Sequence, residues 1–280
     1  MSADATTDST RRFPGEVRSE STVAALPRRD RVLITAALVL ITALAWAYLI
    51  RLDREMSASM AHETMMAEMG MSMDRPWTPT DVLFTFAMWA VMMIGMMAGS
   101  AAPVLLLFGA TRRARGESGV SLATVAFGAG YILVWVGFSA AAALAQWALH
   151  EAAMLSPAMG ASSPRVGGAI LIAAGAYQLS PMKGGCLSRC RSPLGFLMAH
   201  WRDGVMGALS LGLRHGVFCL GCCWALMCVL FVVGVMNLVW VAALTAVVLL
   251  EKTGPYGVAV ARAAGAAMIS IGLIFISGLV

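Results

Sequence analysis

Residues 81–110 read DVLFTFAMWAVMMIGMMAGSAAPVLLLFGA, and every side chain after Asp81 is uncharged. About 20 consecutive apolar residues cross the hydrocarbon core of a bilayer as a helix, so this stretch is long enough to span a membrane and to tilt. Backbone amides in lipid must find their hydrogen-bond partners within the segment, which a helix provides. The stretch therefore predicts a transmembrane helix.

Six further apolar segments accompany this one along the chain. They cover residues 32–50, 120–149, 166–181, 204–236, 237–250 and 258–280. Arg214 and His215 interrupt the run at 204–236, so we expect a short entry helix followed by a fifth span, and Asn237 alone marks the start of the sixth. The uncharged run at 32–50 is longer than the apolar region of a typical signal peptide, which favours a retained anchor over a cleaved signal. The sequence predicts an all-α, polytopic transmembrane helical bundle of about seven spans.

The composition agrees with a membrane protein and argues against several soluble classes. Of 280 residues, 59% are hydrophobic and 12% are charged, and the mean hydropathy is +0.78. A soluble globule of this length needs more charge on its surface, which excludes an ordinary soluble enzyme, a disordered chain and a nucleic-acid-binding module. The chain also lacks a P-loop, a dinucleotide-binding fingerprint and a serine nucleophile elbow. We therefore expect no enzymatic activity, no catalytic residue and no nucleic-acid partner.

Basic residues define the expected orientation. Most of the 20 Lys and Arg residues fall in the N-terminal tail and in the loops after the second, fourth and sixth predicted spans. Basic residues favour the cytoplasmic side, so these segments and the N terminus are predicted to be cytoplasmic, in a chain embedded in the lipid of the cell (inner) membrane. Residues 1–30 are predicted to be a disordered tail and residues 31–280 a transmembrane domain. This domain includes an extracytoplasmic Met-rich loop at 51–80 and a cytoplasmic loop with Cys and Arg at 182–203.

The predicted outer loop is rich in methionine, in a polar sequence where core packing does not explain it. Seven of the 21 methionines fall between residues 56 and 73. Thioethers are soft ligands that suit Cu(I), and imidazole suits copper and zinc, so the pattern favours metal capture. A loop of random composition, an amphipathic helix on the membrane and a Met-rich protein-binding surface are the alternatives. The candidate ligands are Met60, His62, Met65, Met66, Met69, Met71 and Met73.

A second group of methionines lies within the span at 81–110. Met88, Met92 and Met96 recur every four residues, so a helix places them on one face. Plain packing or lipid contact produces such a stripe as well. Because the stripe directly follows the Met-rich loop, it offers a continuous path for a soft metal, and we treat these three residues as candidate ligands.

Three cysteines fall within one predicted helix. Cys219, Cys222 and Cys223 share one face of it with His215, one turn earlier, whereas Cys228 lies on the opposite face. Two thiolates at this spacing can hold Cu(I), with a third ligand from a neighbouring helix. A free cysteine is otherwise a small buried hydrophobe, which is the alternative for this group.

Two more cysteines lie in the predicted cytoplasmic loop. Cys186 and Cys190 belong to the basic segment KGGCLSRCR, residues 183–191. Nearby arginines favour the thiolate form, which is the form that binds metal. The four-residue spacing fits a helix or a metal clip in a loop, and the alternative is a basic loop with incidental thiols.

These motifs resemble a bacterial family of predicted metal-binding integral membrane proteins, formerly a domain of unknown function and now often labelled copper chaperones. The matching stretches are Met88-Trp89, Met92-Met93, Met96-Met97, Tyr177-Gln178, Pro181, Lys183, Cys186-Leu187, Cys190-Arg191, Cys219, Gly221-Cys222-Cys223-Trp224, Met227, Gly234-Val235-Met236-Asn237 and Glu251-Lys252. They cover most of residues 81–255, and Gly99-Ser100 departs from the Pro-Ser expected after the Met pairs. The residues alone imply a soft metal, and the resemblance implies copper.

The leading hypothesis is a membrane copper chaperone that binds Cu(I) through Met, Cys and His and passes it to a recipient cuproenzyme. A copper transporter is the first alternative, because thioethers outside and thiols near the cytoplasm also suit the two ends of a path across the bilayer. A membrane thiol–disulfide oxidoreductase is the second, although the predicted outer loops contain no cysteine for the reactive pair it needs. A structural subunit packed through methionines is the third.

Overall fold

The computed structural model describes residues 26–68, 77–152, 163–235 and 237–278, and these ranges contain helices and no strand. The all-α prediction is therefore confirmed. The helices are α2 (Arg28–Glu68), α3 (Pro79–Ala114), α4 (Val120–Glu151), α5 (Pro164–Leu179), α6 (Pro181–Arg191), α7 (Pro193–His200), α8 (Gly204–Cys228), α9 (Leu230–Val233), α10 (Leu238–Thr253) and α11 (Gly257–Ser277).

Each predicted span corresponds to a helix, but not every helix is long enough to cross a bilayer. Within the described residues, five stretches are long and apolar enough: the part of α2 up to Ala58, α3, α4, α8 together with α9, and α11. Helices α5 and α10 have 16 residues each. At 1.5 Å per residue each is about 24 Å long, less than the hydrocarbon core of about 30 Å. The count of seven spans is therefore not confirmed.

Helix α8 corrects the sequence prediction at its centre. It runs without a break from Gly204 to Cys228, through Arg214 and His215, where a short entry helix was expected to end. Neither residue removes a backbone donor, so neither interrupts helical hydrogen bonding. The Arg214 side chain is exposed, and the His215 side chain is buried among aromatic rings. Both polar groups are thus accommodated without a change in the backbone.

Both predicted loops contain helical structure. Helix α2 continues to Glu68, so the first part of the predicted loop at 51–80 is helical, and residues 69–76 lie outside the described residues. The segment at 182–203 forms α6 and α7. Ser180 begins α6, because its hydroxyl accepts a hydrogen bond from the Lys183 amide at 3.3 Å and Pro181 occupies the first turn.

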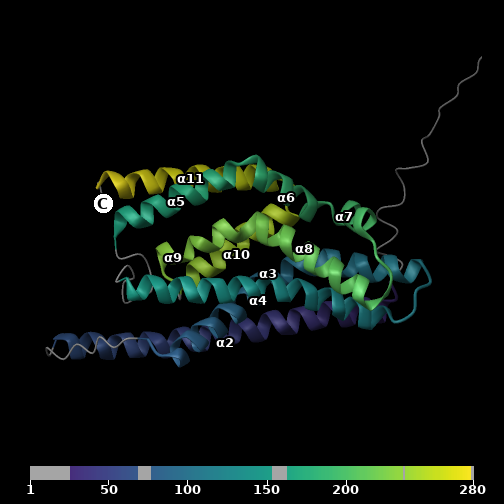
Figure 1. Ribbon diagram of the computed structural model, residues 1–280, viewed down its shortest axis with the longest axis horizontal. Coiled ribbons are helices and arrows are strands. Elements are labelled where there is room, and N and C mark those ends of the chain that lie inside the picture. Colours follow the sequence, from purple (N-terminus) through teal and green to yellow (C-terminus); the bar gives the residue numbers. More distant parts are fainter. Residues whose placement is uncertain (1–25, 69–76, 153–162, 236, 279–280) are drawn as a thin grey trace, which may run out of the picture.

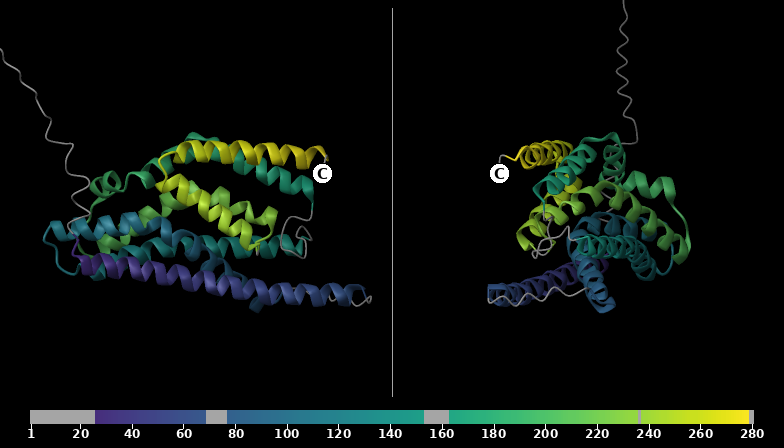
Figure 2. Two further views of the ribbon diagram at one scale, coloured as in Figure 1. Left: turned by 180° about the vertical axis from the view of Figure 1, so that it is seen from behind. Right: turned by 60° about the vertical axis from the view of Figure 1, so that its left-hand side comes forward.

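The helices form two outer groups, each made of antiparallel neighbours, with a third group between them. Figure 1 shows α2, α3 and α4 along one side and the α5–α11 pair along the other, with α8, α9 and α10 in between. Figure 2 shows from behind that α5 and α11 run side by side over most of their length. Helix α6 packs on α8 and also touches α5 and α10. Helix α6 therefore connects α5, α8 and α10.

Glycines allow the closest helix pairs to form. A Cβ at Gly168 would lie 2.7 Å from the Gly272 carbonyl oxygen, and one at Gly175 would lie 2.7 Å from the Gly265 carbonyl oxygen. Real Cβ atoms do not approach backbone this closely, so the α5–α11 pair depends on these glycines. Small residues have the same role at helix interfaces in membranes generally.

Candidate metal centre

Three cysteines of α8 face the interior of the protein. The side chains of Cys219, Cys222 and Cys223 are each about 1% exposed, and His215, one turn earlier, is 4% exposed. Cys228 is only partly buried. The structure therefore brings the four predicted ligands of this helix to its buried side.

Helix α6 adds two thiols to the same region. The Cys190 Sγ lies 3.9 Å from the Cys222 Sγ, and the Cys222 and Cys223 sulfurs are 3.3 Å apart. A Cβ at Gly221 would lie 2.8 Å from the Cys186 Sγ, so α6 packs closely on α8 at this glycine. We call Cys190, Cys219, Cys222 and Cys223 the cysteine cluster. All four are free thiols.

A lysine from α10 contacts the cysteine cluster. The Lys252 Nζ donates hydrogen bonds to the Cys219 Sγ at 2.9 Å and to the Ser100 Oγ at 3.1 Å. The Tyr131 hydroxyl lies 3.0 Å from the same sulfur and donates to the Met97 carbonyl oxygen at 3.3 Å. Cys219 thus has a cation and a hydroxyl beside it. If the Cys219 sulfur binds a metal as a thiolate, the Lys252 ammonium can offset its negative charge.

The residue before this lysine belongs to a second buried network. The Glu251 carboxylate forms an ion pair with the Lys183 Nζ at 2.7 Å, with both side chains almost fully buried. The Gln178 amide nitrogen donates to Glu251, and its oxygen accepts from Lys183 at 2.5 Å. Arg191 donates to the Glu251 backbone oxygen at 2.5 Å. These bonds tie α5 and α6 to the end of α10 and thereby hold Lys252 in place.

His215 lies among aromatic side chains. Its ring centroid is 6.1 Å from that of Phe127, 5.8 Å from that of Tyr131 and 5.2 Å from that of Phe196. Its Nδ1 is buried and has no hydrogen-bond partner among the described residues. A buried nitrogen without a partner costs stability, and such an atom in a folded protein calls for an explanation such as a bound ion. This unpaired nitrogen, beside a cluster of soft sulfur donors, suits a soft metal.

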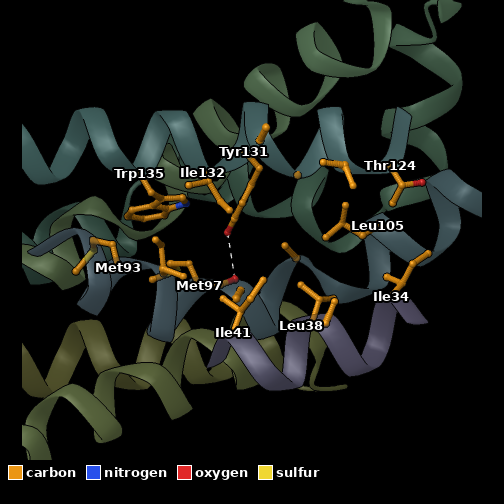
Figure 3. A pocket seen from close by; sticks show the side chains of 17 residues that line it. Ile34, Leu38, Ile41, Met93, Met97, Leu105, Thr124, Tyr131, Ile132 and Trp135 are labelled. Atoms are coloured by element: carbon orange, nitrogen blue, oxygen red, sulfur yellow. Dashed lines mark hydrogen bonds between the residues drawn. The ribbon is translucent and has the colours of Figure 1, made fainter. Parts of the chain in front are cut away.

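The methionine stripe of α3 lies in the protein interior. Met88, Met92 and Met96 are at most 7% exposed, so they pack against protein rather than lipid. The adjacent Met93 and Met97 line an apolar cavity of about 310 Å³ together with residues of α2 and α4. Figure 3 shows that the Tyr131 hydroxyl, at the wall of this cavity, points toward the Met97 carbonyl oxygen.

The outer methionines are only partly covered by the structure. Met65 lies on α2 with its side chain 58% exposed. The side chains of Met60, His62 and Met66, and the whole of Met69, Met71 and Met73, lie outside the described residues.

The described residues contain no set of three or more His, Cys, Asp or Glu side chains arranged as a metal site. What they contain is pairs of sulfur atoms from α8 and α6. Thiolate pairs suit soft ions such as Cu(I) better than they suit the hard cations.

Sequence reasoning assigned no role to Tyr131 or Ser100, and it placed Lys252 only within the Glu-Lys motif of the resemblance. Ser100 and Lys252 are 152 residues apart in the chain, so spacing along the sequence gives no sign of their contact. The one available signal is the pair of charges at 251–252, directly after an apolar run.

The fold and the site define a helical membrane protein with a buried cluster of thiols beside a lysine. The chain belongs to the PpoB2 family, described as copper chaperones, whose model matches residues 86–275. The match confirms the resemblance drawn from the motifs, and it includes all six cysteines but not the Met-rich segment. No curated protein and no solved structure matches the chain.

Proposed function

We propose that the chain binds Cu(I) at the cysteine cluster and passes it to a recipient cuproenzyme. One observation carries the proposal: the buried Cys222 sulfur lies 3.3 Å from the Cys223 sulfur and 3.9 Å from the Cys190 sulfur on another helix. Cys222 thus forms one close sulfur pair within α8 and a second with a thiol of α6. His215, with its unpaired nitrogen one turn from Cys219, is a further ligand in this proposal.

The charges at the cluster favour a monovalent ion. Two thiolates and one Cu(I) carry a net charge of −1, and the Lys252 ammonium brings the sum to zero. An uncompensated charge in a low-dielectric interior is expensive, so a neutral complex is favoured over a charged one. With the same two thiolates, a divalent ion would leave an excess positive charge.

The difference in burial between the two helices suggests a direction for transfer. Cys219, Cys222 and Cys223 are buried, whereas Cys190 and Cys186 on α6 are partly exposed. In our proposal Cys190 exchanges the ion between the buried thiols and the surface of α6, where the recipient docks and Cys186 adds a further thiolate.

The methionines complete the proposed route. In our proposal copper is first captured weakly on the extracytoplasmic side, by Met60, His62, Met65, Met66, Met69, Met71 and Met73. It then moves along α3 through Met88, Met92 and Met96. Contacts between α3 and the cluster support this step, because Ser100 and the Met97 carbonyl both adjoin the groups around Cys219. Thioethers bind more weakly than thiolates, so the ion would move toward the cysteines.

Competition with a chromophoric Cu(I) chelator tests the cluster. The full chain in detergent is titrated beside Cys222→Ser/Cys223→Ser and the control Cys228→Ser, which changes the cysteine on the other side of α8. We expect the double variant to lose its tight Cu(I) equivalent and the control to keep it. Unchanged binding in the double variant would refute the proposal. Copper uptake into proteoliposomes then separates a chaperone, which gives none, from a transporter.

A further inference from the structure

A second cavity, of about 430 Å³, lies where α5, α6 and α11 meet. Lys183, Leu187 and Arg191 line it from α6, Leu179 from α5, and Arg262 from α11, whereas Cys186 and Cys190 are not part of its wall. It is therefore separate from the cysteine cluster. We propose that this cavity is a binding site for the phosphodiester headgroup of an anionic phospholipid, formed by Arg191 and Arg262.

The cavity carries an excess of positive charge. Its described lining includes no carboxyl group. Lys183 is neutralised by the buried Glu251 carboxylate behind it. Arg191 uses one guanidinium nitrogen to hold the Glu251 carbonyl, and Arg262 has no ion pair or hydrogen bond among the described residues. Two guanidinium groups are thus available, and their planar donors fit phosphate oxygens.

Hydroxyl groups add weaker donors to the same wall. The three serines of the lining come from the start of α6, from its last turns and from the residue that follows it: Ser180, Ser188 and Ser192. The Ser188 hydroxyl already donates to the Gly185 carbonyl oxygen at 3.0 Å, so a headgroup that lies between the two arginines can accept hydrogen bonds from the Ser180 and Ser192 hydroxyls. The polar part of the cavity is therefore suited to an anion rich in acceptor oxygens.

The other wall of the cavity is apolar and partly exposed. Leu179 is 47% and Val258 is 51% exposed at the cavity. Helix α11, a candidate membrane span, exposes further large apolar side chains in its last two turns: Ile271, Leu273, Ile274 and Ile276. A soluble anion would leave these apolar side chains uncovered, whereas the acyl chains of a lipid would pack against them. The combination of basic and apolar walls therefore favours a phospholipid over free phosphate.

The position of the cavity fits the level of lipid headgroups. It lies at the first turns of α11 and the last turn of α5, the ends that the basic residues predict to be cytoplasmic. Basic pockets between membrane helices on the cytoplasmic side bind anionic headgroups. Because this site uses neither the cysteines nor Lys252, the inference does not rest on the proposed copper site.

Native mass spectrometry of the full chain in detergent tests the site. The chain is titrated with phosphatidylglycerol or with phosphatidylcholine of the same chain length, and bound lipid is counted on the wild type and on Arg262→Gln. Arg165→Gln is the matched control, because Arg165 is also exposed but lies at the other end of α5. Arg262→Lys keeps the charge. Tm is recorded for every variant as a control for folding. Because Arg262 takes no part in the Glu251 network, its replacement should leave Tm unchanged.

We expect the wild type to bind phosphatidylglycerol in preference to phosphatidylcholine. Arg262→Gln should weaken phosphatidylglycerol binding about fivefold, the change that about 1 kcal/mol per basic residue gives, while Arg165→Gln leaves it unchanged and Arg262→Lys retains most of it. Equal binding of the two lipids, or equal loss in Arg262→Gln and Arg165→Gln, would overturn the proposal. So would full displacement of phosphatidylglycerol by millimolar inorganic phosphate, which would identify a site for free anions.

Discussion

The Lys252 ammonium lies 2.9 Å from the Cys219 sulfur, so a charged side chain at the end of α10 reaches a buried thiol of α8. Lys252 is itself only 8% exposed. Apart from Ser100 and the thiol, no described residue forms a hydrogen bond or ion pair with its ammonium group. A buried cation with so few partners is stabilised by a negative charge nearby, and Cys219 would supply that charge as a thiolate.

Lys252→Met should weaken Cu(I) binding while it keeps the volume of the side chain. A hydrogen bond to a charged group contributes about 1.5–3 kcal/mol, so we expect roughly a 10- to 100-fold loss of Cu(I) affinity. The ratio of Cu(I) to Zn(II) affinity should fall as well, because the fixed positive charge no longer penalises a divalent ion. Chelator competition measures both affinities. Lys252→Arg, which retains the charge, should stay closer to the wild type, and equal losses in both variants would contradict the charge argument.

Removal of one partner of the Lys183–Glu251 ion pair should destabilise the protein. Both side chains are buried, and loss of one partner leaves an uncompensated charge at a cost of about 3–5 kcal/mol. Lys183→Met should therefore lower Tm in detergent clearly, as measured by circular dichroism. The double variant Lys183→Met/Glu251→Leu removes both charges and should regain most of the loss. If the double variant were as unstable as the single one, packing rather than charge would be responsible.

The apolar runs predicted the helices that contain them, because span length follows from bilayer thickness. They gave no sign of α6 and α7, which form in the predicted loop at 182–203. The break expected at Arg214 was wrong, since the sequence does not show that an exposed arginine and a stacked histidine fit one continuous helix. The helical period predicted that Cys219 shares one face of its helix with Cys222, Cys223 and His215. The contact of Cys219 with Lys252 was not predictable, because that contact depends on how α8 and α10 pack, and spacing along the chain carries no information about it.

The crossing of α4 and α8 depends on small residues, and Gly130 is one of them. A Cβ there would lie 2.8 Å from the Leu213 amide nitrogen and would also meet the Leu209 carbonyl oxygen. Because these are backbone atoms, the helices must separate, and Tyr131 would move away from Cys219. Gly130→Ala should therefore cost about 1–3 kcal/mol or more, as overpacking does, and should weaken Cu(I) binding.

Gly137→Ala on the same helix is the control for this change. Apart from the adjacent backbone of α4, no atom of the described residues lies within 4 Å of a Cβ at that position. Alanine favours a helix over glycine by about 0.5–1 kcal/mol, so Tm should stay the same or rise slightly. Equal effects of the two substitutions would show that the close approach at Gly130 does not limit the packing of α4 on α8.

Replacement of the α3 stripe by leucine isolates the contribution of its sulfur atoms. Leu and Met have similar volumes, and such exchanges usually cost less than about 1.5 kcal/mol each. The variant Met88→Leu/Met92→Leu/Met96→Leu should therefore remain folded with an intact cysteine cluster and an unchanged Cu(I) affinity at equilibrium. If the stripe carries copper to the cluster, the rate of loading from a weak Cu(I) donor, followed by stopped-flow absorbance, should fall. Met206→Leu, at an exposed methionine of α8, controls for loss of a thioether elsewhere. A loading rate equal to that of the control would show that the stripe serves only to pack the core. The cysteine cluster would then be loaded with copper by another route.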